Sequence, residues 1–395
     1  MSTHHISKKS KLNDNTSQVM FQYSGQDVPE NVTHVRFHPS VVNVNNDAFR
    51  YRKQLREVVF NDGLRQIGES AFSGCSLLQS IELPSTANKI GVAAFNGCID
   101  LKKVVLNDGL REIGKLAFQS CTSLQQITIP STVTKVGTFA FRGCTELKEV
   151  VLPEGLMEIG LRAFANCKAL QSITIPSTVV EIGTGAFDSC NSLREVVLNE
   201  GLIKIGSGVF HDCTSLQSIT IPSTVDDIGK FAFSNCTNLR EVVLKDGLKM
   251  IESCAFTRCN SLESMTIPST VDEIGFGAFD NCSNLREVVI HNEKVQIDDK
   301  AFSKCTSLER FKFPGLLTRL DIIIQAGQRD IEPKMNGIPT VVEWRSGELS
   351  IPAIRREIED EWGIEMETVV EIDKENLDKI VRLIRYYEIK EATTL

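Results

Sequence analysis

Residues 124–144 read Leu124-Gln-Gln-Ile-Thr-Ile-Pro130, then Ser-Thr-Val-Thr-Lys-Val136-Gly137, then Thr-Phe-Ala-Phe141-Arg-Gly-Cys144. The first part alternates apolar and polar residues, which is the periodicity of a strand with one buried face. It predicts that Leu124, Ile127 and Ile129 point inward. Proline lacks a backbone donor and the Ser-Thr pair favours a turn, so the strand is expected to end there.

The rest of this stretch predicts a return of the chain to its starting side. Val136 is expected to pack inward from a second short strand, and Gly137 to supply the backbone freedom for a positive φ. The segment from Ala140 and Phe141 to Cys144 is expected to form a short helical turn.

The whole pattern recurs every 23 residues without an insertion. Leucine begins it at positions 55, 78, 101, 124, 147, 170, 193, 216, 239, 262, 285 and 308, while phenylalanine and cysteine hold two further columns. One such coil cannot bury its apolar side alone, so the coils must stack. We therefore predict a repeat solenoid whose complete coils, from Leu55 to Ser307, form a parallel sheet roughly 50 Å long.

A longer period of 46 residues lies over the shorter one. Odd coils resemble Leu101-Lys-Lys-Val-Val-Leu-Asn-Asp-Gly109, and even coils resemble Leu78-Gln-Ser-Ile-Glu-Leu-Pro-Ser-Thr86. The alternation predicts two kinds of turn chemistry built on a common core.

The consensus Leu-x-x-Ile-x-Ile-Pro-x-x-Val-x-x-Ile-Gly-x-x-Ala-Phe-x-x-Cys resembles the BspA-like leucine-rich repeats over about residues 32–315. That family occurs in bacterial surface proteins and in some unicellular eukaryotes. The resemblance implies a right-handed leucine-rich-repeat superhelix, with its parallel β-sheet on the concave side, and a binding role without shared catalytic residues. The bacterial surface members are exported, whereas the first residues here contain no apolar run of the kind a secretory signal needs.

The two ends depart from the repeat. Residues 1–30 are polar and unpatterned, which predicts disorder. Residues 31–54 read as an N-terminal capping coil in which Arg52 replaces the cysteine. The solenoid proper is expected over 55–315. Residues 316–395 carry helical patterning, which predicts a C-terminal α-helical segment that either caps the solenoid or binds a partner.

Composition narrows the function classes. The net charge is −8, which gives no general electrostatic basis for binding nucleic acid or anionic lipid. No window approaches the roughly 18 apolar residues of a membrane-spanning helix, so a cytoplasmic protein is expected. Phosphate-binding, serine-hydrolase and zinc-protease motifs are missing, and the histidines within the complete coils, His211 and His291, do not recur. We therefore expect no enzyme activity, no cofactor and no metal site.

The cysteines invite two interpretations. Eleven of the twelve form the repeat column, and they are expected to be buried thiols that act as small apolar side chains. Cys254 lies outside the column, so it is the candidate for a reactive, redox-responsive thiol.

Two surfaces are candidates for a protein partner. One is a column of charged residues expected on the outer face of the strands: Glu57, Lys103, Glu149, Glu195, Glu241 and Glu287. The other is an edge where bulky residues replace the usual small or polar ones: Leu116, Phe139, Leu161, Phe231 and Phe276. Ordinary solvated strand surface would explain the first set, and local packing under a turn would explain the second. The sequence thus favours a protein-binding scaffold, with an adhesin-like surface protein and a thiol-based redox protein as alternatives.

Overall fold

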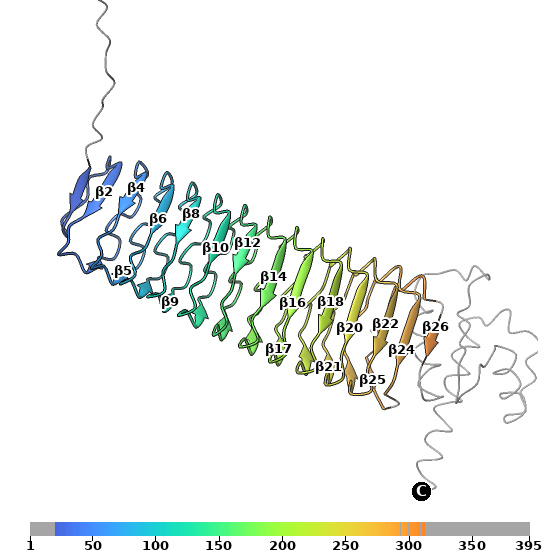
Figure 1. The fold of residues 1–395 in the computed structure, drawn as a ribbon. Coiled ribbons are helices and arrows are strands. Elements are labelled where there is room, and N and C mark those ends of the chain that lie inside the picture. Colours follow the sequence, from blue (N-terminus) through green and yellow to red (C-terminus); the bar gives the residue numbers. More distant parts are fainter. Residues whose placement is uncertain (1–19, 293, 299, 309, 313–395) are drawn as a thin grey trace, which may run out of the picture.

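A computed structural model describes residues 20–312 except 293, 299 and 309. The chain winds into coils that stack one after another along a single axis (Figure 1). Within this part of the chain there is no helix, and so none that is long and apolar enough to cross a membrane. The helices expected over residues 316–395 lie outside the described residues.

Each coil places one longer strand on the same side of the stack. Neighbouring strands are parallel and shifted by 23 residues, so that Gln126 pairs with Glu149. The first five of these longer strands form one sheet, and the later ones form separate sheets of two or three strands. The strands are β1 (Phe21–Tyr23), β2 (His34–Phe37), β4 (Glu57–Val59), β6 (Ser80–Glu82), β8 (Lys103–Val105), β10 (Gln126–Thr128), β12 (Glu149–Val151), β14 (Ser172–Ile175), β16 (Glu195–Leu198), β18 (Ser218–Ile221), β20 (Glu241–Leu244), β22 (Ser264–Ile267), β24 (Glu287–Ile290) and β26 (Arg310–Lys312).

The second short strand expected at Val136 is confirmed. Two-residue strands form one continuous 12-stranded parallel sheet along the other side of the stack. They are β3 (Asn43–Val44), β5 (Gln66–Ile67), β7 (Lys89–Ile90), β9 (Glu112–Ile113), β11 (Lys135–Val136), β13 (Glu158–Ile159), β15 (Glu181–Ile182), β17 (Lys204–Ile205), β19 (Asp227–Ile228), β21 (Met250–Ile251), β23 (Glu273–Ile274) and β25 (Gln296–Ile297).

The core lies between the two sheets and follows the sequence columns. Leu124, Ile127 and Ile129 are buried as predicted, while the intervening polar residues face solvent. The phenylalanines from Phe49 to Phe302 form an unbroken ladder of stacked rings whose centroids lie 4.8–5.6 Å apart. Every coil contributes equivalent apolar side chains, and those of one coil are buried by the coils before and after it.

The N-terminal end is closed by more of the chain than the sequence indicated. Strand β1 lies within residues 1–30, for which disorder was expected, and it pairs with β2. Its Tyr23 is buried, with its ring centroid 5.0 Å from Phe37 and 4.9 Å from Phe49. Arg52, which replaces the cysteine, donates from Nε and Nη2 to the Val28 carbonyl at 3.0 and 2.8 Å.

The 46-residue alternation has a structural cause in the turns between the two sheets. In each even coil a threonine hydroxyl donates to a leucine carbonyl of the preceding odd coil, as from Thr178 to Leu156 at 2.6 Å. In three of the described pairs the same hydroxyl also accepts from the odd coil's glycine amide, at Gly155, Gly201 and Gly247. Equivalent hydroxyl-to-carbonyl bonds occur at Thr86, Thr132, Thr224 and Thr270. The two turn types are therefore complementary, which confirms the expectation of two turn chemistries.

Candidate functional site

The turns that follow the short strands differ from the helical turn expected there. We call residues 137–146 and their equivalents in the other coils the return turns, and their outer rim the return edge. Alternate amides donate to the next coil, as Phe139 donates to Leu161 at 2.9 Å and Phe141 donates to Ala163 at 2.8 Å. The amides between them bond within the turn, as Ala140 donates to Gly137. In a helix, each backbone amide would donate to a carbonyl of the same helix and not to the next coil. The expectation of a helical turn was therefore wrong.

Two columns of each return turn have a left-handed backbone, and neither contains Gly137. The first column follows the glycine by two residues and includes Leu116, Phe139, Gly185, Gly208 and Phe231. The second follows it by six residues and includes Gly74, Gly97, Gly143, Asn166 and Asn235. Glycine and asparagine are frequent in the second column because they adopt positive φ at the lowest cost, and glycine recurs in the first. The positive φ predicted at Gly137 is thus found at other positions.

Gly137 is needed for a different reason. A Cβ at this residue would lie 2.7 Å from the Gly114 carbonyl carbon and 2.7 Å from the Ile113 oxygen, both in the preceding coil. Between these two coils the short strands therefore approach each other too closely for a side chain at residue 137. Two other coils have Glu252 and Asp298 at the equivalent position. Burial and the neighbouring Asp227 raise the pKa of the Glu252 carboxyl group.

The charged column on the longer strands is placed where the sequence predicted it. Glu57, Lys103, Glu149, Glu195 and Glu241 are exposed, and each pairs in register with serine or glutamine of a neighbouring strand. Glu287 is half-buried, with Arg310 Nη2 3.4 Å from its carboxylate. Serine and glutamine between the acids keep like charges two coils apart, so this face offers a polar, mixed surface.

The bulky residues of the return edge form two groups along the solenoid. Leu116, Phe139 and Leu161 belong to three consecutive coils, and Phe231 and Phe276 flank the coil of Cys254. Phe231 is 47% exposed and Phe276 is 44% exposed, while Phe139 and Leu116 are half-buried. The Arg142 guanidinium lies 5.5 Å from the Phe139 ring centroid and the Lys300 ammonium 5.2 Å from that of Phe276.

Backbone conformation makes these bulky residues unusual. Leu116, Phe139 and Phe231 have φ of 62°, 57° and 58°, in the left-handed region. Three equivalent coils use glycine there, and the others use smaller or polar residues such as Ala93 and Ser70. A bulky residue there is uncommon and costs about 1–2 kcal/mol relative to a right-handed conformation. At Phe231 this cost is accepted although the side chain is 47% exposed, which is typical of a residue retained for binding.

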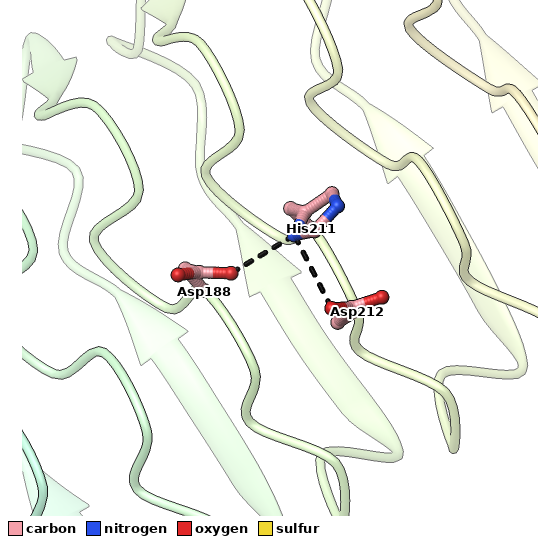
Figure 2. Close-up of side chains that lie close together, drawn as sticks. All are labelled: Asp188, His211 and Asp212. Atoms are coloured by element: carbon pink, nitrogen blue, oxygen red, sulfur yellow. Dashed lines mark hydrogen bonds and ion pairs between the residues drawn. The ribbon is translucent and has the colours of Figure 1, made fainter.

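Between the two apolar groups lies a polar cluster that the sequence did not reveal. His211 Nδ1 is 3.0 Å from Asp188 Oδ1 and 3.5 Å from Asp212 Oδ2 (Figure 2). Asp188 and His211 occupy the same column of consecutive coils, 23 residues apart, and this equivalence was the available signal. The hydrogen bond with Asp188 is the largest cause of a raised His211 pKa, which burial partly opposes. The pKa of Asp188 is lowered, because bonding to His211 and Ser189 outweighs its burial.

The cysteine column forms a ladder of buried thiols. Each Sγ donates to the carbonyl of a phenylalanine 26 residues earlier, as Cys167 donates to Phe141 at 3.3 Å. Burial raises the pKa of the column thiols from Cys75 to Cys282, to about 12 at Cys144 and Cys190. Cys254 is half-buried, and its pKa is also raised by burial and by Asp280. A raised pKa lowers the thiolate fraction, which speaks against an activated redox thiol.

Thiol labelling checks this assignment. In the native protein we expect a maleimide to modify one cysteine of the twelve, Cys254, and slowly. All others are expected to react only after unfolding, because their sulfur atoms are buried and protonated. The Cys254→Ser variant serves as the matched control and should show no native labelling. Rapid modification of Cys254 at neutral pH would restore the redox hypothesis, and modification of column cysteines would contradict their burial.

Comparison with known proteins places the repeats in a family model. Residues 28–136, 111–240 and 203–324 match the model described as BspA type leucine rich repeat region (6 copies). Together the matches span residues 28–324, well over half of the chain. No curated protein matches the sequence.

Many solved structures share the fold, and 123 of their chains match. A leucine-rich repeat protein from Bacteroides ovatus is 26% identical, with 80% of this chain and 84% of that chain covered and a TM-score of 0.64. A leucine-rich cell surface protein from Faecalibacterium prausnitzii is 27% identical, with 78% and 93% covered and a TM-score of 0.47. The first of these supports the leucine-rich-repeat solenoid described above.

Proposed function

The chain belongs to the BspA type leucine-rich repeat proteins, and from this premise we propose that it is a non-catalytic scaffold that binds a protein partner. One observation carries the proposal: the return edge holds two large exposed phenylalanines, and one of them, Phe231, has the left-handed backbone that favours glycine. Aromatic side chains, phenylalanine included, are enriched in the buried core of protein interfaces. Phe231 and Phe276, two coils apart, are the residues we assign as the main contacts.

The second candidate surface is the charged column of the longer strands. Its exposed glutamates suit the polar rim of an interface, where charges set orientation and association rate more than affinity. We therefore place the principal contact at the return edge, and we assign the column an orienting role toward a partner with basic groups.

A capture experiment with matched variants tests this assignment. The tagged full-length protein is crosslinked in its own cells, and captured partners are quantified by mass spectrometry. We expect Phe231→Ser together with Phe276→Ser to reduce capture of specific partners at least tenfold, since a central aromatic contact is worth about 2 kcal/mol or more. The control pair Glu195→Gln and Glu241→Gln has similar exposure and should reduce capture only a few-fold.

The opposite pattern of capture would assign the main contact to a different surface. If the glutamine pair abolishes capture and the serine pair leaves it intact, the strand face is the principal contact. A truncation ending at Pro314 tests residues 316–395, which we propose cap the end of the solenoid. Partners that disappear with that truncation, while circular dichroism shows a folded solenoid, would assign recruitment to the C-terminal segment instead.

We also propose that the protein works in the cytoplasm. Twelve cysteines that fold into unpaired thiols suit a reducing compartment, because an oxidising one would allow them to pair during folding. The alternative is an adhesin-like protein at the cell surface, as some family members are. A membrane-impermeant biotin reagent applied to intact cells distinguishes the two, since it reaches only a surface protein.

A further inference from the structure

The return edge contains a group of side chains that scaffold binding leaves without a role. Asp188, His211 and Asp212 come from two consecutive coils, and their ligand atoms all lie within 4.8 Å of one another. Figure 2 shows the Nδ1 side of the imidazole directed between the two carboxylates. Within the described residues, this is the one such group of three histidine, cysteine or acidic side chains.

The cluster contains two carboxylates, but the one hydrogen that His211 Nδ1 can carry is able to bond only one of them. Nδ1 of His211 carries at most one hydrogen, yet the Asp188 and Asp212 carboxylates both approach that same atom. One N–H can donate well to only one of them, so the other carboxylate faces a nitrogen without a hydrogen bond. A cation bound to the Nδ1 lone pair would satisfy both carboxylates together.

The distances suit a transition metal ion. Ligand bonds of about 2.0–2.1 Å in a tetrahedral site place ligand atoms about 3.3–3.5 Å apart. His211 Nδ1 lies 3.0 Å from Asp188 Oδ1 and 3.5 Å from Asp212 Oδ2, so small side-chain movements would complete the geometry. One imidazole and two carboxylates are ligands that Zn²⁺ accepts, with a water molecule in the remaining position.

Neighbouring groups hold the carboxylates in place. Asn235, from the following coil, donates to Asp212 Oδ1 and leaves Oδ2 directed at His211. Ser189 Oγ donates to Asp188 Oδ1 at 3.2 Å, and Asn191 Nδ2 donates to the Asp212 main-chain oxygen at 3.0 Å. Partners of this kind orient metal ligands, and their loss typically weakens metal affinity about 10–100-fold.

We propose that Asp188, His211 and Asp212 form a binding site for a divalent transition metal ion of the Zn²⁺ class. The ion joins the sixth and seventh complete coils and lies between the two apolar groups of the return edge. It therefore fixes the relative position of the surfaces on either side. Because it binds only the stacked coils, it stabilises the folded chain as its concentration rises.

Protons compete with the metal at this site. The imidazole must be neutral to bind a metal ion, and the pKa of His211 is raised by Asp188, followed by Asp212, against burial and Arg162. Arg162 also contributes to the lowered pKa of Asp188. Metal affinity is therefore expected to fall as the pH decreases and protons occupy the imidazole.

The test uses the untagged full-length chain with His4→Ala, His5→Ala and Cys254→Ser, which removes the two adjacent histidines near the N-terminus and the accessible thiol. Isothermal titration with ZnCl₂ at pH 7.5 is expected to give one ion per chain. His211→Ala should weaken binding at least 100-fold and Asn235→Ala about tenfold. His291→Ala removes an exposed histidine outside the cluster and should leave affinity unchanged.

Two further readouts keep the result interpretable. CoCl₂ should give a visible spectrum of nitrogen and oxygen ligands without the charge-transfer band of thiolate, and His211→Ala should abolish it. Circular dichroism checks that each variant is folded. Absence of zinc binding in the parent, or equal affinity in the parent and in His211→Ala, would overturn the proposal. In that case the three side chains form an ion pair only, and the proposed partner site at Phe231 is unaffected.

Discussion

Replacing Phe187 with alanine is expected to lower the free energy of unfolding by about 3–5 kcal/mol. Phe187 is fully buried, and its ring stacks on Phe164 at 5.5 Å and on Phe210 at 5.6 Å. The substitution removes the transfer energy of one ring and leaves two neighbouring rings facing a cavity. Because each coil is buried only by its neighbours, the loss falls on the two interfaces that join the halves of the solenoid.

Urea denaturation followed by circular dichroism measures this effect, and the chain supplies its own control. Phe231→Ala removes the same ring from a site where the side chain is 47% exposed. It is expected to change the free energy of unfolding by less than about 1 kcal/mol. Equal effects of the two substitutions would mean that the stacked ladder does not hold the coils together.

The second large effect is expected at Gly137, where alanine should lower the free energy of unfolding by about 1–3 kcal/mol or more. The added Cβ would meet two backbone atoms of the preceding coil at 2.7 Å, and neither is a flexible side chain that can turn aside. Relief therefore requires the two coils to separate, which weakens the short-strand pairing between β9 and β11. Chemical denaturation again provides the measurement.

Asparagine separates crowding from backbone strain. At Gly143 φ is 75° and the nearest atom to a Cβ lies 3.7 Å away, so Gly143→Asn is expected to be tolerated better than Gly143→Ala. At Gly137 the order is expected to reverse, because the larger side chain increases the overlap. If asparagine were the better substitute at both positions, a positive φ at Gly137 would be required after all.

The sequence was sufficient for the parts of the fold that rest on burial. Columns of identical residues at a fixed spacing predicted the stack, the inward face at Leu124 and the short strand at Val136, since each depends on side-chain polarity alone. The glycine column was located correctly, but its cause was not. Crowding between coils is a property of their separation, and polarity patterns carry no information about that distance.

The backbone conformation of the return turns could not be predicted from the sequence in this way. Their donors alternate between the same coil and the next, so the turn conformation depends on a neighbour 22 residues away rather than on local preference. The frequent glycine and asparagine two and six residues after Gly137 were the available clue to the left-handed positions. His211 was judged alone because it does not recur, although Asp188 occupies the equivalent position one coil earlier. Because the coils stack, residues 23 positions apart in the sequence become neighbours in space. This places Asp188 beside His211.

The complementary turns of odd and even coils restrict how this protein can change in length during evolution. Deleting a single coil would bring two turns of the same type together. Loss of an odd coil would leave one threonine hydroxyl without its leucine carbonyl, and loss of an even coil would leave one odd-coil turn without its threonine. Deleting or duplicating 46 residues preserves every such pair. Natural variants of this solenoid should therefore differ in length by even numbers of coils, because the structural unit that can be gained or lost is a pair.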